Sequence, residues 1–326
     1  MIINGFIDLQ INGYKGIDFS SDSLTTEGCY KAFKGIIACG TIIFLPTVIT
    51  SPINTLIRNL GIIAEAISAP EFEDHIPGIH LEGPFFANSS GIGAHNPKYI
   101  QIADVSILEK LIKVSKNKIK LLTVGADLEN VDTLIRFAVK SGIKVSLGHH
   151  MADLKQISSA KEAGATNLTH LGNGVANLVN RHENPIWAGL SVNDLKAMII
   201  TDGHHLPINL IKIFLKVKGI ENIIVVSDAA PLAGMSPGKY FTLGNNVVLR
   251  SDGKLFNPEK ECLVGSSAMM IDCMNFLFKS GCFSYKDLAT LGFKNQLEYL
   301  GIDFPEKLKH LKLVRFSEEN GFALIV

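Results

Sequence analysis

Histidines recur directly after short apolar runs of this sequence, and this residue type can bind a metal ion or transfer protons at neutral pH. Five of the ten histidines stand in such positions, namely His149, His150, His170, His204 and His205. A single histidine after an apolar run is more often a buried core residue than a ligand. Repetition at equivalent places along the chain favours a shared site, which the ends of several strands would build together.

Glu82, His149 and His170 are the residues that best fit a metal ion. Two histidines and one glutamate on zinc leave a fourth position open for water, which is typical of a catalytic site. A histidine pair in place of Gln10 and Asn12 would hold a second metal ion, whereas neutral amides do not supply such ligands. The sequence therefore predicts one divalent ion per subunit, with Zn²⁺ preferred and Fe²⁺ as the alternative.

Asp228 follows the last of the apolar runs and is the predicted acid and base. A carboxylate close to a metal-activated water can accept its proton and later deliver that proton to a leaving amine. Two alternatives stay open at this point, because Asp228 can also serve as a further metal ligand or as a cap for the turn that follows.

The elements that must position these residues follow a regular alternation. Eight apolar runs predict strands: Ile2–Leu9, Thr41–Val48, Ile76–Leu81, Ile119–Val124, Lys144–Gly148, Thr166–His170, Lys196–Thr201 and Asn222–Ser227. Amphipathic segments between them predict helices: Thr26–Ala38, Pro52–Ile67, Val105–Val114, Val131–Ser141, Leu154–Ala163 and Pro207–Val217. Helical crossovers require parallel strands, and eight repeats favour an α/β fold of the (β/α)₈ TIM-barrel type, whose chemistry lies at the carboxyl ends of the strands.

The chain beyond the eighth run reads differently. Residues 239–261 predict a β-hairpin excursion, and helices return near Ser267–Lys279 and Tyr285–Leu300. Two short runs near the end, Leu311–Phe316 and Gly321–Val326, predict a small sheet. We therefore expect one barrel over residues 1–310 and a short C-terminal β remnant over residues 311–326.

Composition excludes several classes of function. The 326 residues carry 31 Lys and Arg against 31 Asp and Glu, so the zero net charge provides no field that attracts nucleic acid or an anionic membrane. Apolar residues make up 47% and charged residues 19%, which argues against disorder. The five cysteines form an odd set without a C-x-x-C pair, so we expect reduced thiols.

Targeting signals are not evident in the sequence. No basic region followed by an apolar run and a cleavage site stands at the N-terminus. The longest apolar stretch, residues 35–49, is interrupted by Gly40, Thr41 and Pro46 and falls short of a membrane span. We expect a cytoplasmic protein.

Eight short motifs occur in order along nearly the whole chain. They are GFIDLQING at 5–13, HLEGPF at 80–85, GAHNP at 93–97, GH at 148–149, THLGN at 169–173, DGHH at 202–205, SD at 227–228 and GSS at 265–267. Together they resemble the N-acetylglucosamine-6-phosphate deacetylase family of the amidohydrolase superfamily. The resemblance implies metal-dependent hydrolysis of a phosphorylated N-acetyl amino sugar to the amino sugar phosphate and acetate.

The same resemblance implies a role for each matching residue. The metal ligands would be Glu82, His149 and His170, the proton-transferring carboxylate Asp228, and the residue that polarises the acetyl carbonyl His205. The remaining substrate contacts would be Ala94 and His95 with the sugar, Asn173, Gly174 and Arg181 with the phosphate, and Leu263, Val264 and Gly265 along the pocket. In the family the matching arginine reaches across a dimer interface, so the resemblance also implies a homodimer.

The sequence departs from the family pattern in three places. Only four residues precede Gly5, so we expect the accessory β-sandwich of the family to be reduced or absent. His150, His182 and His204 add imidazoles beside the matched positions, where they can bind metal or face solvent. Residues 172–177 are richer in glycine than the family pattern, which alters the expected shape of the phosphate loop.

Two other functions remain open from the sequence. One is a related amidohydrolase that acts on another N-acetyl-hexosamine phosphate. The other is a non-catalytic barrel that binds a sugar phosphate, although the complete set of Glu82, His149, His170 and Asp228 argues against it.

Overall fold

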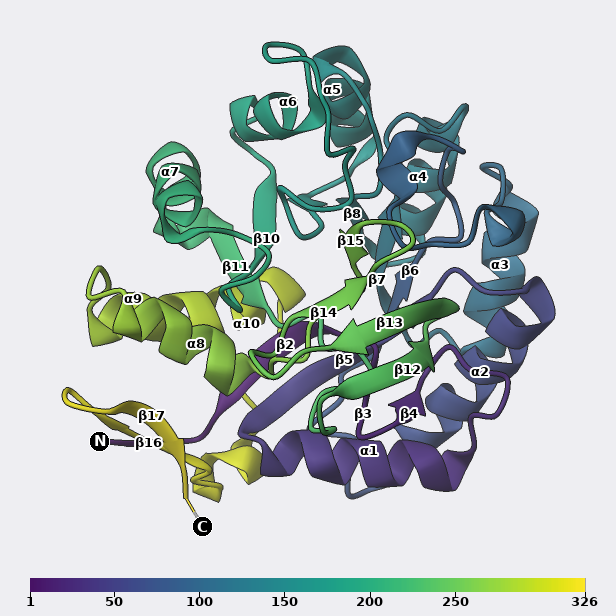
Figure 1. Ribbon diagram of the computed structural model, residues 1–326. Helices are drawn as coiled ribbons and strands as arrows, with labels where there is room; N and C mark the ends of the chain where they lie inside the picture. Colours follow the sequence, from purple (N-terminus) through teal and green to yellow (C-terminus); the bar gives the residue numbers. More distant parts are fainter. Residues whose placement is uncertain (326) are drawn as a thin grey trace.

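Eight parallel strands alternate with helices in the computed structural model of the chain, which describes residues 1–325 (Figure 1). The strands pair in the order of the sequence: β2 (Phe6–Ile11), β5 (Thr41–Ile49), β6 (Ile79–Glu82), β7 (Ile119–Val124), β8 (Lys144–Leu147), β9 (Asn167–Leu168), β10 (Lys196–Ile200) and β11 (Ile223–Val226). Every predicted run overlaps one of these strands, and the (β/α)₈ fold class is confirmed.

One helix follows each barrel strand and covers the outside of the barrel. These helices are α1 (Thr26–Ala38), α2 (Ile53–Ala66), α3 (Val105–Val114), α4 (Val131–Lys140), α5 (Leu154–Ala163), α6 (Pro185–Ser191), α7 (Ile208–Lys218) and α8 (Met270–Lys279). Side chains of Thr25, Asp104 and Asp153 accept hydrogen bonds from the first turns of α1, α3 and α5, which explains where these helices begin. The sequence did not predict α6, which has only seven residues.

The barrel interior is apolar at its amino-terminal end. Residues such as Ile7, Leu9 and Met198 fill this end, and Tyr299 and Leu308 belong to the same buried cluster. The last two belong to the segment that closes the barrel, which contains α9 (Tyr285–Ala289), η4 (Thr290–Lys294), α10 (Asn295–Leu300) and η5 (Glu306–His310). Glu82, His149 and His170 lie at the opposite, carboxyl end of the strands.

The ring of strands is closed by side chains between β11 and β2, where the regular ladder is reduced to one bridge between Ile11 and Ala229. The buried carboxylate of Asp8 accepts hydrogen bonds from the backbone N–H and the hydroxyl of Ser227. The backbone N–H of Asn12 donates to the Ala229 carbonyl at 2.7 Å. These hydrogen bonds close the ring through polar contacts inside the barrel. Burial there raises the pKa of Asp8 to about 7.

An antiparallel sheet follows β11 and lies in front of the barrel in Figure 1. It contains β12 (Gly238–Thr242), β13 (Asn245–Leu249), β14 (Leu255–Asn257) and β15 (Cys262–Leu263). The predicted hairpin excursion at 239–261 is thus a four-stranded sheet. Its apolar side chains, including Val247 and Leu255, form a separate small core with Ala230 and Val264.

The two ends of the chain pair with each other. Strand β1 (Ile2–Ile3) is hydrogen-bonded to β16 (Val314–Ser317), which pairs with β17 (Gly321–Leu324). The predicted first run is therefore split, since its first residues leave the barrel and join this three-stranded sheet. Val326, the last residue of the predicted run Gly321–Val326, lies outside the described residues.

Short elements complete the part of the chain that the structure describes. They are β3 (Gly13–Tyr14), β4 (Ile17–Asp18), η1 (Ser90–Ile92), η2 (Pro97–Tyr99) and η3 (Ile220–Asn222). Among residues 1–325, no helix has the length and apolar character needed to cross a membrane.

Candidate active site

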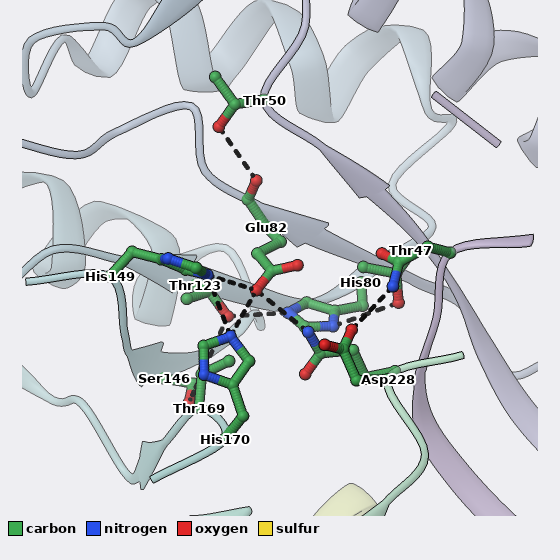
Figure 2. A network of polar contacts seen from close by, with 12 residues as sticks. Thr47, Thr50, His80, Glu82, Thr123, Ser146, His149, Thr169, His170 and Asp228 are labelled. Carbon is green, nitrogen blue, oxygen red and sulfur yellow. Dashed lines mark hydrogen bonds and ion pairs between the residues drawn. The ribbon is translucent and has the colours of Figure 1, made fainter. Parts of the chain in front are cut away.

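Glu82, His149 and His170 meet at the carboxyl end of the barrel, and we call these three residues the Glu-His-His set (Figure 2). Glu82 ends β6, whereas the histidines follow β8 and β9. Glu82 Oε1 lies 3.1 Å from His149 Nε2 and 3.0 Å from His170 Nε2, and the two nitrogens are 3.0 Å apart. Three ligand atoms at such distances leave room for one ion about 2 Å from each of them, as zinc requires.

The glutamate of this set is held as a carboxylate. Burial would raise its pKa, but contacts with His149 and His170 outweigh burial and hold the pKa of Glu82 well below its usual range. Gln10 Nε2 donates a further hydrogen bond to Glu82 Oε1 at 3.0 Å. Gln10, which stands where a histidine could bind a second metal ion, therefore orients the carboxylate of Glu82.

Asp228 follows β11 and lines the same cavity as the Glu-His-His set. Asn12 Nδ2 donates to Asp228 Oδ1 at 2.8 Å and fixes the carboxyl group in place. Burial, followed by the nearby charge of Glu82, raises the pKa of Asp228 to about 6. A carboxyl group with a pKa close to neutrality can both accept and return a proton.

The backbone is unusual at three of these residues. His149, His170 and Asp228 have φ values of 54°, 31° and 49°, in a region that residues other than glycine rarely adopt. Each of the three comes immediately after or close to the end of a barrel strand. The turn aims the side chain across the barrel mouth, so the conformation that is unfavourable for the chain is the one that assembles the site.

A layer of hydroxyl groups and one histidine lies beneath the Glu-His-His set (Figure 2). His80 Nε2 contacts Thr123 Oγ1 at 2.8 Å, and Thr123 Oγ1 contacts Thr169 Oγ1 at 2.8 Å. Thr169 in turn donates to Ser146 Oγ at 2.6 Å. Burial lowers the pKa of His80 to about 4, so this residue supports the site as a neutral side chain.

His205 is oriented by Asp202, which stands three residues earlier in the loop after β10. His205 Nδ1 donates to Asp202 Oδ2 at 2.8 Å, and Ser266 Oγ donates to the same oxygen at 2.9 Å. The other oxygen accepts the backbone N–H groups of His204 and His205. Burial opposes ionisation, but the contacts with His205 outweigh it and hold the pKa of Asp202 below its ordinary value.

We expect Asp202→Asn to lower kcat by about 100-fold, the order of effect seen when a donor to a developing oxyanion is lost. The amide N–H₂ would face the N–H of His205 and the hydroxyl of Ser266, so His205 would turn away from its position. Steady-state kinetics measure the loss, and Asp303→Asn, at an exposed aspartate, is the matched control. Unchanged kcat in a folded Asp202→Asn protein would contradict this role.

The free energy of unfolding should depend on pH through Asp202, and comparison of wild type with Asp202→Asn should reveal this dependence. Because folding lowers the pKa of Asp202, the wild-type carboxylate stabilises the fold above its unfolded pKa of about 4, and this stabilisation is lost as the pH falls below that value. Urea unfolding at several pH values should therefore show wild type and Asp202→Asn converging in acid. A constant difference between them would exclude the ionised Asp202 as its source.

Glycines shape the loop after β9. Gly172 and Gly174 have φ values of 91° and 63°. A Cβ atom on Gly174 would lie 3.0 Å from His149 Nδ1 and 3.0 Å from His170 Cε1. The absence of a side chain at Gly174 therefore allows the backbone to pass directly beside the Glu-His-His set.

A cavity of about 480 Å³ contains most of the predicted site residues. Its lining includes Glu82, Ala94, His95, His149, His170, Asn173, Gly174, His205, Asp228, Leu263, Val264 and Gly265. Arg181 is exposed and does not belong to the lining. Of the three additional histidines, His204 lines the cavity, His150 is buried outside the Glu-His-His set, and His182 is exposed.

Several contributors were missed by reasoning from the sequence. Gln10 and Asn12 were interpreted only as excluding a second metal ion, yet each hydrogen-bonds a carboxylate of the site. Asp202 lies inside one of the recognised motifs, and its spacing of three residues before His205 was an available signal. Ser266 is also within a motif, but nothing in the sequence indicated that it contacts Asp202.

Comparisons with known proteins place this site in a family. The chain is 32% identical over 293 residues to the N-acetylglucosamine-6-phosphate deacetylase of Danio rerio, and the match covers 86% of this chain and 71% of the relative. This chain belongs to the N-acetylglucosamine-6-phosphate deacetylase family. No protein-family model matches it.

Other deacetylases differ in the sugar that their names state. The chain is 30% identical over 251 residues to the N-acetylgalactosamine-6-phosphate deacetylase of Escherichia coli O157:H7. That match covers 76% of this chain and only 64% of the length of the relative. This member of the N-acetylglucosamine-6-phosphate deacetylase family is therefore similar to enzymes named for either epimer.

A solved structure supports the same fold. The N-acetyl-D-glucosamine-6-phosphate deacetylase of Mycobacterium smegmatis, as an aspartate-to-alanine variant in complex with N-acetyl-D-glucosamine-6-phosphate, superposes with a TM-score of 0.86 at 22% identity. The match covers 98% of this chain and 84% of that chain. The likeness shows that the chain has the fold of that deacetylase over nearly its whole length.

Proposed function

We propose that this protein is a metal-dependent deacetylase that hydrolyses N-acetylglucosamine 6-phosphate to glucosamine 6-phosphate and acetate. The observation that carries the proposal is the Glu-His-His set beside Asp228 in a cavity large enough for a sugar phosphate. Family membership supports the same reaction. An isolated metal site would support hydrolysis in general, whereas the family supports an N-acetyl amino sugar as the substrate.

The Glu-His-His set fits one divalent ion, with Zn²⁺ as the first candidate and Fe²⁺ as the second. Two imidazoles and one carboxylate suit both metals, and metal availability often decides between them. The Nε2 atoms of His149 and His170 and the Oε1 atom of Glu82 lie within 3.1 Å of one another, so a cation at their centre would contact all three at once. When bound, the ion supplies Lewis acidity, which polarises the amide carbonyl and makes water a stronger acid.

The side chains around this position carry the proton transfers. Asp228, held by Asn12, accepts a proton from the attacking water and delivers it to the nitrogen of the leaving amine. His205 lines the cavity, and its Nδ1 is held by Asp202; with a proton on both ring nitrogens it donates from Nε2 and stabilises negative charge on the carbonyl oxygen. The C–N bond then breaks, and acetate and the amino sugar phosphate leave.

Acetate release tests the proposed function. The purified protein should release acetate from N-acetylglucosamine 6-phosphate at least ten times more efficiently than from the unphosphorylated sugar. N-acetylgalactosamine 6-phosphate should be included, because the relative from Escherichia coli O157:H7 is named for that epimer. Preference for the galactose epimer would change the substrate, and metal binding without any turnover would favour a sugar-phosphate binding protein.

We also propose a homodimer in which Arg181 serves the cavity of the partner. Arg181 is exposed and outside the cavity of its own subunit, near Leu178 and Trp187, which are 92% and 46% exposed. Trp187 Nε1 donates to the Arg181 carbonyl at 3.1 Å and connects these residues. Asn173 and Gly174 would contribute phosphate contacts from the lining of the cavity, and a guanidinium would add a charged fork.

A mixing experiment tests this arrangement. Arg181→Ala and Asp228→Asn should each lose most activity alone, whereas mixed dimers should recover about a quarter to a half of it, because one cavity then combines an intact Asp228 with an intact Arg181. Sedimentation at several concentrations should show the dimer. A monomer at micromolar concentration with full activity would contradict the proposal.

We propose residues 1–310 as the hydrolase barrel and residues 311–326 as a remnant of an accessory sheet. Strands β16 and β17 support this division, because they pair with each other outside the barrel, where β1 joins them from the other end of the chain. All five cysteines are free, which suits a reducing compartment such as the cytoplasm.

A further inference from the structure

Lys254 is the last residue of the turn between β13 and β14, and it lines the cavity of the candidate active site. Successive side chains of a strand point to opposite faces. Lys254 and Phe256 accordingly face the cavity, whereas Leu255 and Asn257 are buried on the other face. The four-stranded sheet of β12–β15 therefore presents an ammonium group to the site.

The turn that carries Lys254 is fastened to the barrel. Ser267 Oγ donates to the Gly253 carbonyl at 2.6 Å, and His204 Nε2 donates to the Asp252 carbonyl at 3.0 Å. Asp252 also accepts the backbone N–H of Lys254 at 3.1 Å. These contacts fix the backbone at Lys254 relative to the barrel end, and they give His204 a structural role.

The ammonium group of Lys254 is not neutralised by a carboxylate of the described residues 1–325. Among the residues that the structure describes, Lys254 is the one lysine or arginine in the lining of the cavity and makes no ion pair. Its Nζ lies 5.1 Å from the ring centroid of Phe256, close enough for a cation–π contact. Nearby Lys260 differs, since its ammonium group donates to the Ala94 carbonyl at 3.0 Å.

The remaining charges of the lining are negative. Glu82, Asp228 and Glu261 are carboxylic acids that face the same cavity. A phosphate dianion entering such a cavity needs a cation, and within one subunit Lys254 is the group that provides it. An ammonium–phosphate hydrogen bond is charge-assisted and therefore stronger than a neutral one.

We propose that Lys254 binds the phosphate group of the substrate from within the same subunit. This inference rests on the proposed function, because it takes a phosphorylated amino sugar as the ligand. It assigns the four-stranded sheet of β12–β15 a part in substrate selection, in addition to the contacts expected from Asn173, Gly174 and Arg181.

Selectivity for the phosphorylated sugar tests the role of Lys254. We expect Lys254→Met to lower the ratio of kcat/KM for N-acetylglucosamine 6-phosphate to that for N-acetylglucosamine by about 10- to 100-fold, as loss of a charge-assisted hydrogen bond predicts. The change should arise in KM, and Lys254→Arg should restore most of the ratio. The matched control is Lys239→Met, an exposed lysine of the same sheet. An unchanged ratio, or equal losses for both sugars, would overturn the proposal.

A binding measurement separates this inference from the proposed reaction. Calorimetry with glucosamine 6-phosphate, glucosamine and inorganic phosphate needs no turnover. If the wild type releases no acetate but Lys254→Met binds glucosamine 6-phosphate more weakly than the wild type does, the proposed reaction is rejected and the phosphate contact is kept. Active wild type combined with equal product binding by wild type and Lys254→Met would keep the reaction and reject the contact.

Discussion

Asp228→Asn should lower kcat by about 10³-fold, within the range expected when the general acid and base of a hydrolase is lost. The amide keeps the shape of the side chain and can still contact Asn12, but it cannot accept a proton from water or return one to the amine. KM should change by less than about three-fold, because the loss falls on the transition state. Acetate release under saturating substrate measures the effect.

The pH dependence gives an independent check on the same residue. Because burial raises the pKa of Asp228 to about 6 and the group must be ionised to act as a base, kcat/KM of the wild type should fall below about pH 6. Asp228→Asn should lack this acid limb. Equal metal content in the two proteins is the required control, and turnover near the wild-type level in the metal-loaded variant would exclude Asp228 as the base.

His170→Ala should abolish both tight metal binding and activity. The substitution removes one of only three predicted ligands, and the buried carboxylate of Glu82 would lose the contact at 3.0 Å. We expect bound metal to fall from about one ion per subunit to less than 0.1 and activity to fall by at least about 100-fold, since loss of even an outer-shell partner costs 10- to 100-fold. Metal analysis of the purified proteins and acetate release measure the two effects.

His310→Ala is the matched control, because His310 is an exposed histidine outside the Glu-His-His set. Its metal content and activity should equal those of the wild type. Removing metal from the wild type with a chelator should abolish acetate release, and adding back Zn²⁺ or Fe²⁺ separately should show which ion restores more activity. Full activity after removal of all bound metal would contradict the proposed mechanism.

The barrel could be predicted because its sequence repeats a local pattern. The run at Ile119–Val124 is identical in the structure, and Thr26–Ala38, Val105–Val114 and Leu154–Ala163 form helices with the predicted bounds. The positions of Glu82, His149 and His170 followed from the same pattern, because the carboxyl ends of parallel strands share one end of a barrel. The geometry of that end needed no long-range information beyond the strand order.

The contacts that depend on distant segments could not be predicted in this way. Asp8 and Ser227 are 219 residues apart, and Lys254 reaches the cavity only because its turn is fastened to His204 and Ser267. No periodicity encodes such pairings. The split of the first run was missed for a similar reason, since Ile2 and Ile3 pair with β16 at the other end of the chain.

The left-handed backbone at His149, His170 and Asp228 has a consequence for evolution and engineering. Residues with a Cβ atom destabilise the fold at such φ values, by about 1 kcal/mol or more each, whereas glycine adopts them freely. Selection for thermal stability alone would therefore replace the three residues that the proposed chemistry requires. A barrel of this kind that has lost its substrate should accumulate glycine or asparagine at these positions first, so that a gain in stability records the loss of catalysis.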